Sequence, residues 1–266
     1  MSPTGPTSLA SMDGEIMPAA EAMIPVTDEG LVRGDGVFEV MRVYNGTPYA
    51  FDAHLARMQR SAENMRLPVD LESVRADTFR LLAEAGTGPD HQCLRIMVTR
   101  GGRRILLTEQ MIPVADNARL MSITYSPTRI LDGVKSLSYA ANMLAGRLAR
   151  EQGYDEALLV TPHGRVLEAP TSSIFYVKHG RLLTPPLDEH ILASITRALV
   201  IEVTGAEEQS CTVQELYDAD EVFLASTVRE VQTVGSIDGH EYTGPSPVSD
   251  RTRDAVSTRI TEQLRG

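Results

Sequence analysis

The chain has 266 residues, 42% of them hydrophobic, which is enough for one large domain or two domains of ordinary size. A formal net charge of −11 argues against a nucleic-acid-binding surface and against binding to an anionic membrane. The first residues lack the basic start and apolar run of a secretory signal. No segment approaches the ~18 apolar residues of a membrane span. Cys93 and Cys211 form no metal or redox motif. These features predict a cytoplasmic protein that has no metal site and binds neither nucleic acid nor a membrane.

Residue patterning in the first part of the chain predicts short strands that alternate with helices. Residues 1–11 are rich in Pro, Ser, Thr and Gly, and we expect them to form a loose tail. Residues 37–44 alternate as a strand does, and the Asn45-Gly46 pair after them is a strong signal for a hairpin turn. A helix is expected to begin near Ala53, with Asp52 as its N-cap. Its apolar residues recur at helical spacing: Leu55, Met58, Ala62 and Met65. A second helix is expected over 71–86, followed by strands over 91–100 and 120–126.

The pattern changes near residue 116, after which strands predominate. A helix is expected from Tyr139 to Gln152, because Gly153 is a natural stop and apolar residues recur before it at helical spacing. The expected apolar face of this helix consists of Met143, Leu144, Leu148 and Ala149. Beyond it we expect strands over 156–160, 165–168, 173–177 and 221–226, a helix from about Ser194 to Val203, and a final helix from Asp250.

The predicted fold class is therefore α+β, with mixed α/β content and two domains. No internal repeat or low-complexity tract interrupts this pattern. After the tail, residues 12–115 are expected to form a smaller α/β domain, residues 116–120 an interdomain linker, and residues 121–266 a larger, strand-rich domain.

Lys135 stands out because the chain has only two lysines, the other being Lys178. Arginine stays protonated and cannot form an imine, whereas a desolvated lysine can lose its proton and act as a nucleophile. Lys135 follows an apolar stretch and precedes a helical pattern, while Lys178 lies next to His179-Gly180, which is typical of an exposed turn. Taken alone, Lys135 is better explained as a lysine whose stem covers a strand edge while its amine stays in water.

A lysine that binds pyridoxal phosphate needs a partner for the pyridine nitrogen and donors for the phosphate. Glu168 is a candidate for the first role, because a carboxylate there keeps the nitrogen protonated; the alternative is a surface glutamate on a strand edge. Ser194 opens a predicted helix whose first N–H groups could bind a phosphate, with the Thr196 hydroxyl as a further donor. The alternative for Ser194 is an ordinary N-cap.

Two further groups could contact a phosphate or a substrate. Thr227 and Val228 follow a buried strand and offer another turn of N–H groups, and Arg57 could add a charge-assisted contact to the same phosphate. Arg103 and Arg104 follow Gly101-Gly102 and could meet a substrate carboxylate from a flexible loop. Two solvated loop arginines are an equally good interpretation of that pair.

In this order along the chain, these pieces resemble the class IV aminotransferases of pyridoxal-phosphate fold type IV. That family includes branched-chain and D-amino-acid aminotransferases, (R)-amine transaminases and aminodeoxychorismate lyases. The resemblance extends from about Asp28 to Val234. It rests on the motifs at residues 34–40, 54–58, 134–137, 153–157, 164–168, 183–186 and 195–197.

The resemblance implies a two-domain fold and a set of residue roles. Lys135 would form the imine with pyridoxal 5′-phosphate and carry the proton between substrate and cofactor, and Glu168 would pair with the pyridinium. The other implied cofactor-binding residues are Arg57, Tyr139, Leu192, Ile195, Thr196 and Thr227. Phe38, Arg42 and Val228 would line the substrate pocket. The family also implies a homodimer whose subunits share their active sites.

The predicted activity is transfer of an amino group from an amino acid, preferably apolar or branched-chain, or from an amine, to a 2-oxo acid such as 2-oxoglutarate or pyruvate. Two alternatives stay open: an aminodeoxychorismate lyase that releases pyruvate, and a non-catalytic binding protein on the same fold. Such lyases often carry arginine at the position of Tyr139, which favours transfer. Ser138 and Ser173 stand where family members often have asparagine, and a serine replaces only one of the hydrogen bonds of an amide.

Overall fold

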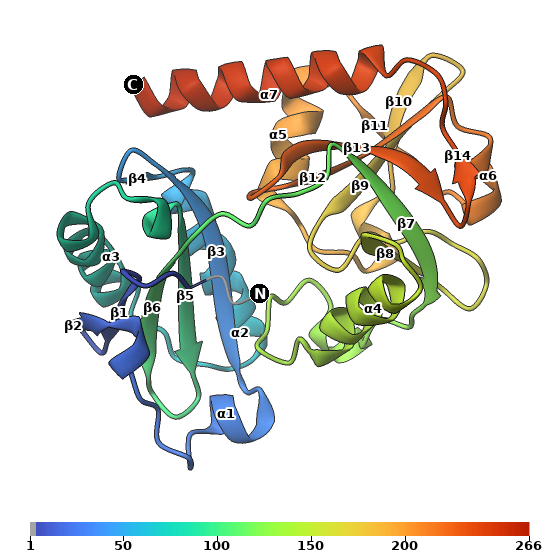
Figure 1. Ribbon diagram of the computed structural model, residues 1–266. Coiled ribbons are helices and arrows are strands. Elements are labelled where there is room, and N and C mark those ends of the chain that lie inside the picture. The colour runs from blue at the N-terminus through green and yellow to red at the C-terminus, as the bar shows by residue number, and fades with distance from the viewer. Residues whose placement is uncertain (1–3, 266) are drawn as a thin grey trace. The chain divides into compact units, whose positions relative to one another are not determined.

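The computed structural model describes residues 4–265, and the chain divides into two compact units (Figure 1). Unit 1 consists of Met1–Pro113 together with Val134–Tyr139, and unit 2 consists of Val114–Gly133 together with Ala140–Gly266. The sequence placed all of residues 121–266 in one domain, whereas the segment that carries Lys135 packs with unit 1. The lysine is therefore held by the unit that precedes it in the chain.

Within the described residues, unit 1 is built on a six-stranded sheet with the order β2-β1-β6-β5-β3-β4. Neighbouring strands in this sheet run antiparallel. The strands are β1 (Leu9–Met12), β2 (Glu15–Pro18), β3 (Gly36–Tyr44), β4 (Thr47–Pro48), β5 (Cys93–Thr99) and β6 (Arg104–Glu109). The helices are η1 (Ala19–Glu21), α1 (Glu29–Arg33), α2 (Phe51–Asn64), α3 (Leu71–Ala85) and η2 (Pro89–His91).

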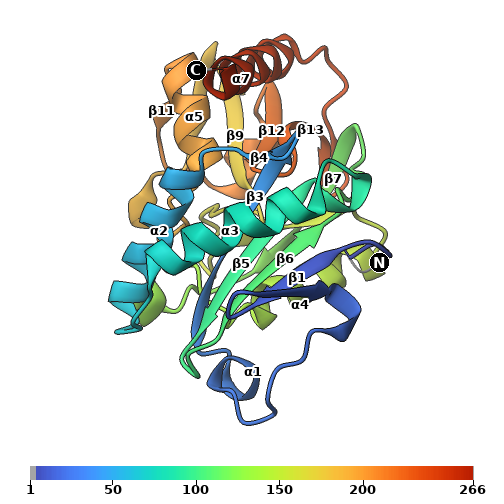
Figure 2. The same cartoon turned by 90° about the vertical axis from the view of Figure 1, so that its left-hand side faces the viewer.

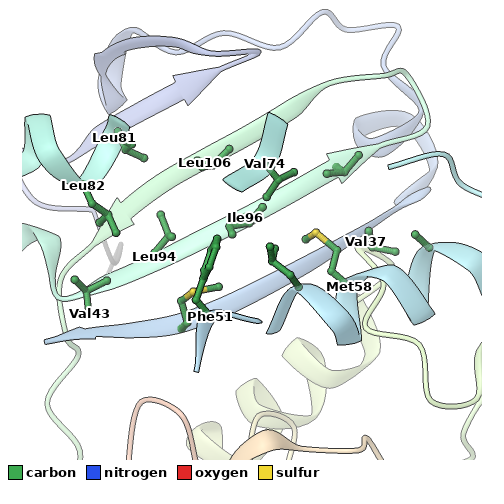
Figure 3. Packing of buried hydrophobic residues seen from close by; sticks show 14 of the residues in the cluster. Val37, Val43, Phe51, Met58, Val74, Leu81, Leu82, Leu94, Ile96 and Leu106 are labelled. Carbon is green, nitrogen blue, oxygen red and sulfur yellow. The ribbon is translucent and has the colours of Figure 1, made fainter. Parts of the chain in front are cut away.

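Helices α2 and α3 cover one face of the unit 1 sheet, and the core lies between them and the strands (Figures 2 and 3). Strand alternation explains this arrangement, because Val37, Met41 and Val43 point from β3 to the helices and are buried. Met58 of α2 and Ile96 of β5 are also fully buried in the same cluster. Each such side chain stabilises the fold by roughly 1.5–3 kcal/mol relative to an exposed one.

Unit 2 holds an eight-stranded sheet, counted within the described residues, with the order β11-β10-β9-β12-β13-β7-β8 and with β14 paired to β13. Its strands are β7 (Asn117–Thr124), β8 (Glu156–Val160), β9 (Ser173–Lys178), β10 (Arg181–Thr184), β11 (Glu207–Glu208), β12 (Glu221–Ser226), β13 (Glu230–Ile237) and β14 (His240–Glu241). Its helices are η3 (Arg129–Leu131), α4 (Ala140–Glu151), η4 (Leu187–Glu189), α5 (Ile195–Thr204), α6 (Val213–Tyr217) and α7 (Pro247–Arg265). Helix α4 packs on β7 and β8, while α5 and α7 pack on each other and on β12.

Several predicted elements differ from the structure. Residues 9–11, expected to end a loose tail, lie in β1, and residues 117–120, expected in a linker, begin β7. Residues 165–168 form isolated bridges through Arg165 and Val166 in place of the expected strand. Each of these segments gains backbone partners far away in the sequence, which local composition does not reveal.

Two helices also differ in detail from the prediction. Helix α2 begins at Phe51, so Asp52 lies in its first turn, and the N-cap Ala50 makes no side-chain cap. In α4 the small residues Ala145 and Ala149 are buried. Its larger apolar side chains are exposed instead: 38% for Met143, 49% for Leu144 and 40% for Leu148. Close packing of α4 on β7 and β8 selects the small residues.

No helix within residues 4–265 is long and apolar enough to cross a membrane.

Candidate active site

The segment that carries Lys135 is bound to the start of β3 by backbone hydrogen bonds. The Phe38 N–H donates to the Lys135 carbonyl at 3.0 Å, and the Leu137 N–H donates to the Gly36 carbonyl at 2.9 Å. The Lys135 N–H donates to the Ser61 hydroxyl of α2 at 3.2 Å. The lysine backbone is therefore fixed from two elements of unit 1, a strand and a helix.

Two aromatic rings lie near the Lys135 amine. The amine nitrogen lies 4.4 Å from the centre of the Phe38 ring and 5.7 Å from the centre of the Tyr139 ring. The rings meet edge to face, with centroids 5.3 Å apart and planes at 77°. Ring faces attract a cationic amine and exclude water from one side of it. The Lys135 amine is therefore held next to two aromatic side chains of unit 1.

Beside this segment, Glu39 binds two side chains of α2. Its carboxylate accepts hydrogen bonds from Arg57 Nε at 2.8 Å and Arg57 Nη2 at 2.6 Å, and His54 Nδ1 lies 2.7 Å from the second oxygen. All three side chains are buried. Burial alone would raise the pKa of the Glu39 carboxyl, but the hydrogen bonds from Arg57 and His54 lower that pKa to about 2.

His54 is kept neutral by the same surroundings. Burial lowers its pKa, and the hydrogen bond to Glu39 opposes this effect without cancelling it. Since ionised Glu39 can only accept, His54 carries its proton on Nδ1. Within residues 4–265, His54 Nε2 is buried and has no hydrogen-bond partner. Buried polar atoms usually have a hydrogen-bond partner, so this nitrogen is a place where a donor from a ligand or water would fit.

The predicted substrate residues of unit 1 are divided between two places. Phe38 and Arg42 alternate with the core-facing residues of β3, and the Arg42 guanidinium lies 4.6 Å from the centre of the Tyr44 ring. Arg103 pairs with Asp13 at 2.6 Å, and Arg104 pairs with the buried Asp77 of α3. These ion pairs favour the interpretation of Arg103 and Arg104 as residues that hold the β5–β6 turn.

In unit 2, Glu168 is bonded to the segment that precedes α5. The Leu192 N–H donates to Glu168 Oε1 at 3.1 Å, and the Leu159 N–H donates to the Glu168 carbonyl at 2.9 Å. Burial and then the charge of Glu168 raise the pKa of Tyr125. The structure thus joins two predicted cofactor residues, Glu168 and Leu192, by a direct hydrogen bond.

The start of α5 fits its predicted role as an anion site. Ser194 is the N-cap, and its hydroxyl accepts from the Arg197 N–H at 3.2 Å. Helix geometry leaves the N–H groups of Ile195 and Thr196 without acceptors inside the helix. The third predicted group, Thr227 and Val228, forms the turn between β12 and β13. Backbone donors of this kind attract a phosphate.

Sequence reasoning missed several of these residues. Glu39 and His54 were not proposed as part of the site, although Glu39 falls in the core-facing row of β3 between Val37 and Met41. A carboxylate in such a row was a signal that a buried cation faces it.

Comparison with known proteins identifies the family. The family described as "Amino-transferase class IV" matches residues 36–237. The chain is 30% identical over 272 residues to D-alanine aminotransferase of Bacillus licheniformis, covering 93% of this chain and 95% of that protein. It is 31% identical over 288 residues to the bifunctional aminodeoxychorismate lyase / D-amino acid transaminase of Mycobacterium tuberculosis, covering 95% of this chain and 98% of that protein.

A solved structure agrees with these relatives. The branched-chain aminotransferase of the archaeon Thermoproteus uzoniensis, solved with norvaline, matches with a TM-score of 0.82 and 26% identity, over 95% of this chain and 94% of that one. The chain belongs to the class IV aminotransferases and is an enzyme of that class. The mixed two-sheet fold and the family predicted from the sequence are both confirmed.

Pyridoxal phosphate, the cofactor that this family implies, matches the chemistry of the residues present. The chain offers a lysine amine, a carboxylate for a pyridine nitrogen, and cationic and N–H donors for a phosphate. Unpartnered buried groups support this match. Besides His54 Nε2, the hydroxyls of Ser172 and Ser173 are buried without a hydrogen-bond partner among the described residues, and both lie in the segment after Glu168.

Proposed function

We propose that this aminotransferase uses pyridoxal 5′-phosphate to move an amino group from an apolar or branched-chain amino acid, or from an amine, to a 2-oxo acid such as 2-oxoglutarate or pyruvate. The observation that carries the proposal is Lys135, one of two lysines in the chain, whose amine lies 4.4 Å from the centre of the Phe38 ring and 5.7 Å from that of Tyr139. Its backbone is fixed by β3 and α2. Membership of the class IV family supports the same assignment.

The bound cofactor would supply an electron sink for the negative charge that develops at the substrate carbon. Lys135 would take the proton from that carbon and deliver it to the cofactor carbon that carries the amino group, and would move it in the opposite direction in the second half-reaction. Glu168 would keep a proton on the pyridine nitrogen. The phosphate would be bound by a set of charged, hydroxyl and N–H donors: Arg57, Ile195, Thr196 and Thr227.

The remaining residues orient the cofactor and the substrate. Leu192 would pack on one face of the cofactor ring, and the Tyr139 hydroxyl would bind the phenolic oxygen. Phe38 and Val228 form apolar walls, while Arg42 offers a cation for the substrate carboxylate. Arg103 and Arg104 are weaker candidates for that role because each already has a carboxylate partner.

The preference for an apolar donor rests on these apolar walls. The relatives differ in the amino acid for which they are named, so the test uses donors of both hands. One relative is named for D-alanine and the solved one as a branched-chain aminotransferase. We also propose a homodimer with shared active sites, which sedimentation of the purified protein would test.

A half-reaction tests the proposed function. The cofactor-loaded protein is mixed, without acceptor, with L- and D-amino acids and with (R)-amines. We expect an apolar amino acid to remove the visible absorption of the lysine-bound cofactor in one turnover, and 2-oxoglutarate or pyruvate to restore it. If no donor produces the change, the proposal is wrong.

A second candidate is aminodeoxychorismate lyase activity, because one relative is named as both a lyase and a D-amino acid transaminase. Both reactions need Lys135 and Glu168, so these residues do not separate them. Elimination requires the bulky enolpyruvyl ether of the substrate to be held in the pocket. Release of pyruvate from aminodeoxychorismate, measured in the absence of any amino acid, decides between the two.

A further inference from the structure

Arg229, the last residue of the turn between β12 and β13, connects three segments of unit 2. Its Nη2 donates to Glu156 at the first position of β8 and lies 3.5 Å from the Thr171 hydroxyl in the segment after Glu168. Its Nη1 donates to the Gln232 side chain of β13 at 3.2 Å. The two ends of the guanidinium fork are thus occupied by protein groups.

This contact is a largely buried ion pair rather than a surface one. The Arg229 side chain is 15% exposed and the Glu156 side chain 8% exposed. Gln232 is buried, and its amide donates to the Ala115 carbonyl at 2.6 Å, which fixes the acceptor on which Arg229 rests. A buried ion pair is costly to break because the charge left behind has no water to replace its partner.

The ion pair acts on the turn that ends at Arg229. The Arg229 N–H donates to the Ser226 hydroxyl at 3.3 Å, which closes the turn around Thr227 and Val228. Glu230, the next residue, has a φ of 55°, a left-handed conformation that a residue with a side chain keeps only when its surroundings impose it. The contacts of Arg229 and the start of β13 therefore hold the backbone of this turn in a defined conformation.

We propose that Arg229 is a positioning residue that sets the Thr227–Val228 turn for the cofactor phosphate through its ion pair with Glu156. The inference rests on the proposed function, because it takes that turn as part of the phosphate site. Arg229 acts on the phosphate site through this turn, because its Nη1 and Nη2 atoms contact Gln232, Glu156 and Thr171 of the protein. The same guanidinium also holds Thr171, so it couples the phosphate turn to the segment after Glu168.

The test compares pyridoxal 5′-phosphate with pyridoxal, which lacks the phosphate. Each is titrated into the full-length cofactor-free protein and followed by absorbance. We expect Arg229→Met and Glu156→Gln each to weaken pyridoxal phosphate about tenfold, equivalent to ~1.4 kcal/mol, and to leave pyridoxal unchanged. The double variant should weaken it no further than either single variant, because both remove the same pair. Arg229→Lys should recover part of the affinity through its charge.

Arg119→Met is the matched control. It breaks a pair with Asp155, the residue before Glu156, and that pair is more exposed, with the Arg119 side chain 57% exposed. We expect no effect on either ligand. Circular dichroism and the thermal midpoint of each variant show that it is folded, and a purely structural role would weaken pyridoxal and pyridoxal phosphate equally.

The sign of the Glu156→Gln effect separates the two roles of Arg229. If Arg229 bound phosphate directly, removing its counter-charge would tighten pyridoxal phosphate, which would overturn the proposal. Unchanged affinity in Arg229→Met would overturn it as well. Inorganic phosphate gives the same comparison without the aldehyde. A wild-type protein that binds phosphate but never attaches pyridoxal phosphate would defeat the proposed function, while the phosphate titrations would still decide the role of Arg229.

Discussion

Replacing Glu39 with glutamine removes the one carboxylate that faces both Arg57 and His54. The amide has a single acceptor oxygen for the three hydrogen bonds that the carboxylate accepts, and its NH₂ group faces a donor. The Arg57 side chain is 6% exposed and Glu39 fully buried, so the guanidinium would lose its counter-charge in a dry environment. Leaving one member of such a pair unbalanced costs about 3–5 kcal/mol.

The pKa of Glu39 gives a second figure for the same interaction. The value falls from an ordinary 4.5 to about 2, and each pKa unit is worth ~1.36 kcal/mol, so the ionised carboxylate contributes about 3 kcal/mol at neutral pH. Because the folded-state pKa is depressed, the unfolded chain binds the proton first. The contribution is complete above pH 4.5 and is lost as the pH falls from 4.5 toward about 2.

Urea unfolding of the cofactor-free protein, followed by circular dichroism, measures both effects. At pH 7 we expect Glu39→Gln to lower the free energy of unfolding by about 3 kcal/mol. At one pH unit below the ordinary pKa, the difference from wild type should shrink by about 1.4 kcal/mol. Glu207→Gln, which removes an exposed partner of Arg181, is the control and should leave stability unchanged. A Glu39 variant as stable as that control, or a difference independent of pH, would refute this reasoning.

Three further predictions concern the cofactor. Borohydride reduction of the loaded protein should attach pyridoxal phosphate to Lys135, and Lys135→Ala should abolish attachment and turnover while Lys178→Ala keeps both; a label on Lys178 would contradict the assignment. Glu168→Gln should keep the cofactor bound but lose most transamination, measured as steady-state rate, because a neutral amide does not hold the pyridinium; near-normal rates would move that role elsewhere. Arg57→Ala should weaken the cofactor roughly ten- to hundredfold in an absorbance titration, as expected for one lost charge-assisted bond; equal affinities would mean that Arg57 only supports its helix.

Local patterns predicted the parts of the fold that depend on nearby residues. The alternation in 37–44, the helix over 71–85 and the Ser194 N-cap all have their cause within a few positions of the chain, and all are present. The buried face of α4 differs from the predicted one, because the sheet beneath an amphipathic helix determines which of its faces is buried. Here the face of α4 that packs on β7 and β8 carries the small residues Ala145 and Ala149.

For the candidate site, motifs indicated candidate cofactor residues, but they did not indicate the partners that hold those side chains in the structure. Lys135, Glu168 and Arg57 have side chains whose chemistry is visible in a motif. Arg103 pairs with Asp13, a residue far away in the sequence, and no local pattern forecasts such a partner. Partner choice between distant charges is fixed by strand register, which one sequence does not display.

The hydrogen bonds between β3 and the Lys135 segment join parts of the chain that leave the ribosome at different times. Strands β1 to β6 are complete before Val134 is synthesised, so the nascent sheet of unit 1 exists for a time without its lysine. Contacts between such distant segments form late, because a long loop must close first. Phe38 therefore cannot contact Tyr139 until translation has passed residue 139. Attachment of the proposed cofactor to Lys135 would follow the same order and come after unit 1 has received its last segment.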